Sequence, residues 1–258
     1  MASKGIKIMS TIIGLIIILG ILMVVVGGQQ GWLALVSVGI NFALVFLALV
    51  LMVWHFPPLV ITVLFGIMVL AITIFMGDEN LNVTIPAFWA SVIVLIGMLM
   101  VAFVVVYLAQ AQGFGLEDSD DLEGLSLLVR TSFLQLQLAI VILSTLGAIA
   151  EAAIAVTTGM AELKSQTPEI TMKRLQQSGW HMGQQIVGTT LNTLFFGFFG
   201  GLLALFIWFT GLHYTMSEVL NNKIFVAEML TALLSFLAVI ITVPVSAKMA
   251  VFQWSRAN

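Results

Sequence analysis

Residues 32–54 read WLALVSVGINFALVFLALVLMVW, a run of 23 residues without a charged side chain. A helix of about 20 apolar residues crosses the hydrocarbon core of a bilayer, so this run predicts a membrane-spanning helix. It is too long for a strand of a membrane barrel. In lipid, a helix is also the structure that satisfies its own backbone hydrogen bonds within one segment.

The composition of the whole chain supports the same interpretation. Of its 258 residues, 61% are hydrophobic and 8% are charged, whereas roughly 25% of a soluble domain is charged. A net charge of -3 without a basic run argues against nucleic-acid binding. Cysteine is absent, which excludes disulfides and thiolate metal ligands. We expect a membrane protein with no metal and no cofactor.

Seven stretches are long and apolar enough to be spans, which predicts an all-α, polytopic helix bundle with residues 1–258 as one membrane domain. The stretches are residues 8–26, 32–54, 59–76, 85–110, 133–161, 186–209 and 224–251. Residues 113–132 are expected to form a short amphipathic helix at the interface. Residues 163–185 are expected to form a loop with a helix start at Pro168.

Basic residues predict the orientation, because they favour the cytoplasmic side of a membrane. Two clusters with five basic residues together lie on one side of a seven-span bundle, and a third cluster of two lies on the other. The five are Lys164, Lys173, Arg174, Lys248 and Arg256, and the two are Lys4 and Lys7. The majority predicts an N-terminus outside the cell membrane and a cytoplasmic C-terminus.

Ionisable residues within the spans are candidates for function, because they are costly in lipid and usually face a bundle interior or a cavity. Glu151 lies well inside the fifth span, and Thr158 follows on the same helix face. This pattern indicates an ion or proton path. The alternatives are a carboxylate hydrogen-bonded to a neighbouring helix and one kept protonated by desolvation. Glu228 is a further candidate for this path, but its position about one turn into the last span favours the alternative of an interfacial residue.

The sixth span adds Thr189 and Asn192, which can contact a solute or ion or hydrogen-bond a neighbouring helix. Proline removes a backbone hydrogen bond, so Pro244 is expected to kink the last span. Five glycines are expected to allow close helix packing: Gly147, Gly188, Gly197, Gly200 and Gly201. HExxH, GxSxG and P-loop motifs are absent, so we expect no enzymatic activity.

Several of these residues belong to one extended pattern. It comprises Gly147-Ala148 with Glu151, Glu162-Leu163, Ser178-Gly179, Gly183-x4-Gly188-Thr189-x2-Asn192-Thr193, Gly200, Glu228 and Val243-Pro244. The pattern resembles that of the YibE/F family of multi-pass bacterial membrane proteins, and the length resembles the shorter YibF type. The resemblance implies a bacterial cell-membrane location and a YibE-like partner chain. The chain departs from the family at Gln184-Gln185, where a charged pair is common.

Two functions are consistent with these observations. The first is a subunit of a paired transporter or channel for a small polar solute or ion. The second is a non-conducting structural or regulatory membrane subunit, in a complex with a YibE-like chain or in a homo-oligomer. A polar cavity that joins Glu151 to Asn192 is expected for the first, and a close-packed apolar interior for the second.

Overall fold

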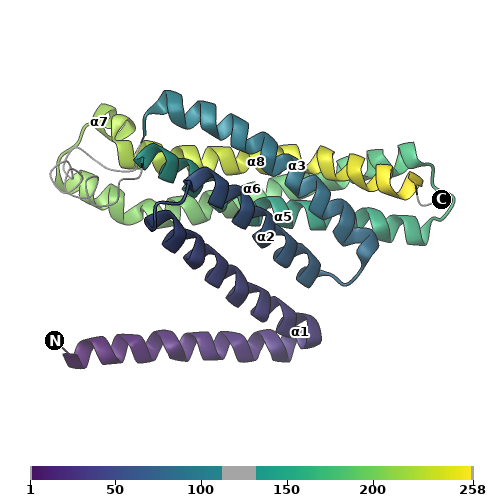
Figure 1. Ribbon diagram of the computed structural model, residues 1–258, viewed down its shortest axis with the longest axis horizontal. Coiled ribbons are helices and arrows are strands. Elements are labelled where there is room, and N and C mark those ends of the chain that lie inside the picture. The colour runs from purple at the N-terminus through teal and green to yellow at the C-terminus, as the bar shows by residue number, and fades with distance from the viewer. Residues whose placement is uncertain (1, 112–131, 257–258) are drawn as a thin grey trace.

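The computed structural model describes residues 2–111 and 132–256, and all regular secondary structure in these residues is helical (Figure 1). The helices are α1 (Ala2–Val53), α2 (Pro58–Gly77), α3 (Leu81–Ala109), α5 (Phe133–Gln166), α6 (Met172–Gly211), α7 (Met216–Asn221) and α8 (Lys223–Arg256). Six of them, all except α7, are long and apolar enough to cross a membrane. The expected helical membrane bundle is confirmed. The expected interfacial helix at 113–132 lies, except for its last residue, outside the described residues.

The first helix, α1, holds two of the expected spans, because its backbone bends sharply at Gly28. Gly28 has φ 57° and ψ −133°, a combination that residues with a Cβ rarely adopt. At Gly31 a Cβ would overlap the carbonyl oxygen of Met23. The two arms of α1 form a V in Figure 1, with Gly20 of the first arm facing Leu35 of the second.

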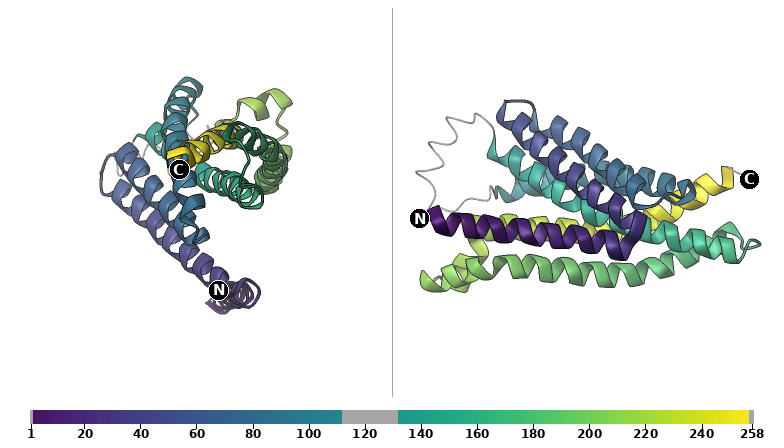
Figure 2. Two further views of the ribbon diagram at one scale, coloured as in Figure 1. Left: turned by 90° about the vertical axis from the view of Figure 1, so that its right-hand side faces the viewer. Right: turned by 90° about the horizontal axis from the view of Figure 1, so that it is seen from below.

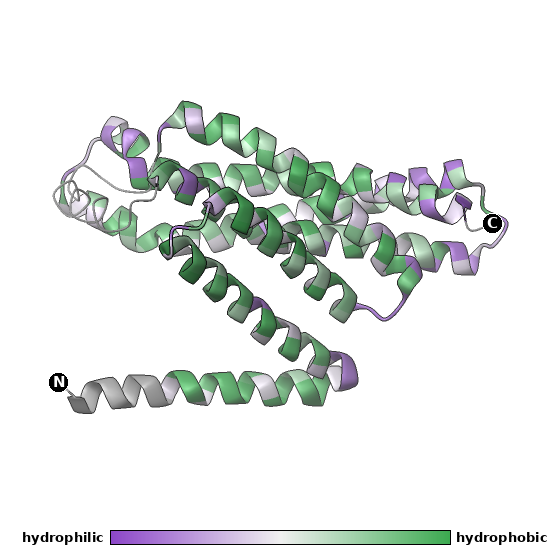
Figure 3. Ribbon diagram, viewed as in Figure 1, coloured by the Kyte–Doolittle hydropathy of each residue, from purple (hydrophilic) through white to green (hydrophobic). Residues whose placement is uncertain are grey.

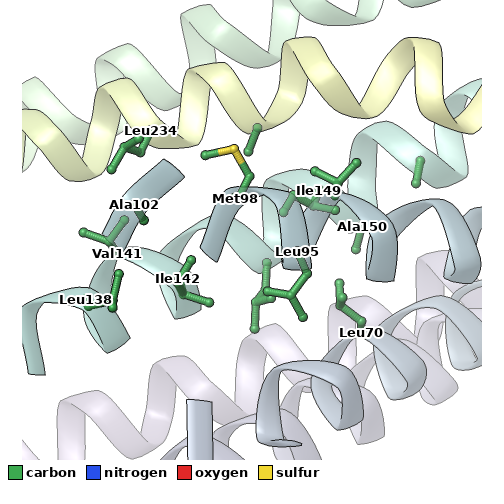
Figure 4. Close-up of a cluster of buried hydrophobic side chains, with 14 of the residues drawn as sticks. Leu70, Leu95, Met98, Ala102, Leu138, Val141, Ile142, Ile149, Ala150 and Leu234 are labelled. Atoms are coloured by element: carbon green, nitrogen blue, oxygen red, sulfur yellow. The ribbon is translucent and has the colours of Figure 1, made fainter. Parts of the chain in front are cut away.

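The main core lies where α2, α3, α5 and α8 meet (Figure 4). Its side chains are aliphatic or methionine, and Leu95, Met98 and Ile149 are almost completely buried. On α8, the buried side carries small residues four positions apart, a pattern that lets neighbouring helices approach closely. They are Ala238, Thr242, Ser246 and Ala250.

The connection between α5 and α6 is much shorter than the sequence indicated. The expected loop at 163–185 is too long, because α5 continues to Gln166 and α6 begins at Met172, four residues after the helix start expected at Pro168. The hydroxyl oxygen of Thr171 caps α6 by accepting the backbone N–H of Arg174 at 3.4 Å. Residues 172–185 are helical but carry exposed polar side chains on one face. These side chains give the segment the composition of a loop.

The two ends of the described chain lie at opposite ends of the bundle (Figures 1 and 2). Hydrophilic residues gather toward both ends, and the middle is predominantly hydrophobic (Figure 3). Which end faces the cytoplasm stays a prediction. α8 continues through Pro244 as one helix, so the expected kink there also stays a prediction.

Candidate functional site

One face of α5 carries small and polar residues in the middle of an apolar helix. Ser144, Gly147, Glu151 and Thr158 are all exposed and share this face. Glu151 lies near the midpoint of α5, and its carboxyl group has no hydrogen bond or ion pair within residues 2–111 and 132–256. The sequence therefore placed Glu151 and Thr158 on one face correctly, but this face lies outside the core.

The corresponding outer face of α6 carries Thr189, Asn192 and Thr193, which are also exposed. Their donors are bonded within the helix. The Thr189 hydroxyl donates to the carbonyl oxygen of Ile186 at 3.0 Å, and the Asn192 amide nitrogen donates to that of Gly188 at 3.0 Å. The Thr193 hydroxyl donates to the carbonyl oxygen of Thr189 at 3.1 Å. The hydroxyl and amide oxygens of this face remain able to accept further hydrogen bonds.

Contacts between α5 and α6 show that these two faces lie at the same depth. A Cβ on Gly159 of α5 would lie 3.1 Å from the sulfur of Met182 on α6. The two helices run antiparallel. Glu151 lies eight residues before Gly159, and Thr190 lies eight residues after Met182. Glu151 and Thr190 therefore lie at the same depth. Thr189 and Asn192 are thus within one helical turn of Glu151 in depth. We call the exposed faces of α5 and α6 together the outer polar face.

Thr189 also lies beside the seam between α5 and α6. It is seven residues beyond Met182, so the two side chains share a helix face, and Met182 points toward α5. Asn192, three residues beyond Thr189, is its neighbour on the helix surface. No hydrogen bond within the described residues joins Glu151 to Thr189 or Asn192, so the outer polar face is a juxtaposition rather than a closed site.

Glu228, in contrast, is far from this group. The Gln137 amide nitrogen donates to the carbonyl oxygen of Ala227 at 3.4 Å, near the starts of α5 and α8. Lys164 lies over the Trp254 ring near the ends of the same helices, so they run parallel. Glu151 is fourteen residues beyond Gln137, about 21 Å along the helix axis. A single path that includes both Glu151 and Glu228 would have to extend over that length of the bundle.

The five glycines expected in helix packing have no neighbours within the described chain. A Cβ placed on any of them would have nothing within 4 Å; they are Gly147, Gly188, Gly197, Gly200 and Gly201. The glycines that lie nearest to a neighbouring helix are Gly159, Gly179 and Gly183, which contact α5, α6 or α8. The five glycines without such neighbours would pack against another chain. Their role in helix packing stays a prediction.

Glu151 and Asn192 are both exposed on the outside of their helices. No charged side chain among the described residues is buried, and the buried polar groups are hydroxyls and amides. The described residues also contain no group of three His, Asp or Glu side chains that could hold a metal ion. The polar groups that could contact a solute are therefore on the outer surface of α5 and α6.

The family match covers both of these helices. Residues 15–256 match the family model described as YibE/F-like protein. The chain belongs to the YibE/F-like protein family. Neither the curated proteins nor the solved structures contain a match to it. In this YibE/F-like protein, the matched residues include the whole of the outer polar face and the buried core.

Among the polar contacts between helices that sequence reasoning missed, one joins two side chains. In the second arm of α1, the amide nitrogen of Asn41 donates to the Thr73 hydroxyl of α2 at 2.8 Å. The Asn41 side-chain oxygen is buried without a hydrogen-bond partner among the described residues. A single asparagine in the apolar run 32–54 is the feature by which the sequence could have indicated this contact.

Proposed function

We propose that this YibE/F-like protein is a membrane subunit whose outer polar face forms one wall of a pathway for a small polar solute or ion. The observation that carries the proposal is the exposed, unpaired carboxyl group of Glu151 near the middle of α5. A charged side chain at this depth costs about 3 kcal/mol on insertion scales when it faces lipid. Water or a second protein chain is therefore needed beside it.

The residues around Glu151 are suited to both kinds of neighbour. Thr189 and Asn192 present oxygen atoms at the same depth, and such groups can replace part of the hydration shell of an ion. Gly147 and Gly188 leave open space where larger side chains would stand, and small residues let a second helix approach closely. The second chain is a YibE-like protein or another copy of this one.

A structural or regulatory subunit that conducts nothing is the second candidate. The apolar core cluster formed by α2, α3, α5 and α8 favours it, since the buried side chains of this cluster are aliphatic or methionine. In this case Glu151 would only hydrogen-bond to the second chain. The two candidates differ in whether ionisation of Glu151 is needed.

The substitution Glu151→Gln separates the two candidates, because glutamine keeps the size and hydrogen bonding of glutamate but cannot ionise. The protein is purified in mild detergent with any chain that accompanies it and is reconstituted into liposomes. Dyes trapped in the liposomes report the flux of protons, sodium and potassium. We expect Glu151→Gln to reduce the flux of the conducted ion about tenfold or more, given the energy of the charge at this depth.

Glu162→Gln is the matched control. Glu162 is exposed on the same side of α5, but it lies in the last turns of the helix and already accepts a hydrogen bond from the Gln166 amide at 3.2 Å. This variant should conduct as the unmodified protein does. Undiminished flux through Glu151→Gln would refute the role of Glu151 in conduction. A complex that assembles normally but passes none of the three ions would favour the structural candidate.

A further inference from the structure

A groove opens on the outer surface between α6 and α8, away from Glu151. Its volume is about 470 Å³, and it is lined by Gln176, Gln177, Trp180, Pro244, Ala247 and Lys248. This volume lies in the range of about 300–1,000 Å³ that is usual for ligand pockets.

The groove follows from the close approach of α6 and α8. Gly179 lies against Ala247, and Gly183 lies against Val243, so close in both cases that a Cβ on the glycine would crowd the facing side chain. With the helices this near, Trp180 and Pro244 form apolar walls on the two sides of the seam. Trp180 is 47% exposed, which leaves one wall available to a ligand.

The depth of the groove matches the boundary between lipid head groups and acyl chains. The indole nitrogen of Trp254 donates to the carbonyl oxygen of Asn82 at 3.1 Å, at the end of the bundle. Lys248 is six residues before Trp254, about 9 Å closer to the middle of α8. A lysine at this depth extends its amine toward the interface while its carbon chain stays against apolar surface, and tryptophan is enriched at such boundaries.

The charge of the groove favours an anionic ligand. Lys248 is exposed and has no ion pair within the described residues. The side chains that line the groove include no acid, and Gln176 and Gln177 add amide groups that can donate hydrogen bonds. A zwitterionic head group also has a cationic end, and the groove offers no carboxylate to pair with it.

We propose that this groove binds one anionic glycerophospholipid. The lipid phosphate accepts hydrogen bonds from the amine of Lys248, and one acyl chain lies along Trp180, Pro244 and Ala247. The occupant is a lipid rather than a free phosphate, because most of the wall is apolar and a free anion would leave it bare.

Native mass spectrometry of the purified full-length protein tests the proposal with dioleoylphosphatidylglycerol as the probe. We expect this lipid to bind more tightly than dioleoylphosphatidylcholine. Lys248→Gln should weaken its binding about fivefold, the effect of one basic residue near an anionic membrane, and Lys248→Arg should retain it. Lys223→Gln is the matched control, because Lys223 is an exposed lysine at the opposite end of the same helix.

Three outcomes would overturn the proposal. The first is equal binding of the two lipids by the unmodified protein. The second is unchanged phosphatidylglycerol binding by Lys248→Gln, or an equal loss in Lys223→Gln. The third is displacement of phosphatidylglycerol by soluble glycerol phosphate at similar concentrations, which would show that the groove recognises the phosphate without the acyl chain.

Discussion

Gly28 and Gly31 hold the bend of α1 for two different physical reasons. Gly28 has a backbone conformation with φ 57°, and a residue with a Cβ held in a rarely populated region costs about 1–3 kcal/mol. At Gly31 the obstacle is contact, because a Cβ would overlap the Met23 carbonyl oxygen. The adjacent Gly27 has open space around it and no positive φ.

These differences predict the effect of alanine at each glycine. Gly28→Ala and Gly31→Ala should separate the two arms of α1, whereas Gly27→Ala should leave them together. Cysteines at Gly20 and Leu35, which face each other across the arms, report the separation through the yield of a short crosslinker. A high yield in Gly31→Ala, equal to that in Gly27→Ala, would contradict this account of the bend.

The short helix α7 shows how a local hydrogen-bond pattern fixes an element. The hydroxyl oxygen of Thr215 accepts the backbone N–H of Glu218 at 3.4 Å, and a Glu218 carboxylate oxygen accepts the Thr215 backbone N–H at 2.6 Å. This reciprocal arrangement is a capping box. The hydrogen bonds from the backbone and the hydroxyl of Thr215 lower the pKa of Glu218 below its usual value of 4.5.

The lowered pKa predicts how α7 responds to acid. A carboxylate with a depressed pKa in the folded state stabilises it fully above the unfolded pKa. That contribution is lost as the pH falls through the folded pKa. Hydrogen exchange corrected for its intrinsic rate should therefore accelerate in α7 below about pH 4.5. Glu218→Gln should remove this pH dependence, because glutamine does not ionise.

The start of α6 provides an internal control for this measurement. Its cap is the hydroxyl of Thr171, which accepts the backbone N–H of Arg174 without a carboxylate, so its protection should not change over the same pH range. Equal acceleration at both helix starts would mean that acid loosens the protein generally. That result would count against a specific role for Glu218.

The elements differ in how far the sequence could predict them. The turn at residues 27–31 separates the first two spans because its glycines permit a conformation that other residues avoid, and the spans predicted at 8–26 and 32–54 leave this turn between them. α7 was missed, although Thr215 and Glu218 have the spacing of a capping box. Residues 172–185 were assigned to a loop because the exposed polar side chains outweigh Leu175 and Gly179, which are buried.

Depth within the membrane was easier to predict than rotation of the helices. The position of Glu151 along its span follows from counting residues in an apolar run. Whether Glu151 faces the core or the outside depends on which side of α5 packs against α3 and α8. Ala150 and Ala153 are on that side, and both are as apolar as residues that contact lipid, so the sequence does not distinguish the two directions.

The arrangement of the whole molecule predicts opposite sides of the membrane for two exposed positions. Gln166 ends α5 at the end of the bundle where α8 also terminates, and Ser217 lies in α7 at the other end. Four exposed or half-exposed basic residues accompany the first end, namely Lys164, Lys173, Arg174 and Arg256. Basic residues favour the cytoplasm, so Ser217 should lie outside the cell and Gln166 inside.

Cysteine labelling can measure this directly, because the chain has no cysteine of its own. In intact cells, an impermeant thiol reagent should label Ser217→Cys, and it should label Gln166→Cys only after the membrane is opened. The reverse result would invert the orientation while keeping the fold. Labelling of both positions in intact cells would contradict the fold itself, because α5 and α6 would then fail to carry the chain between the two faces of the bilayer.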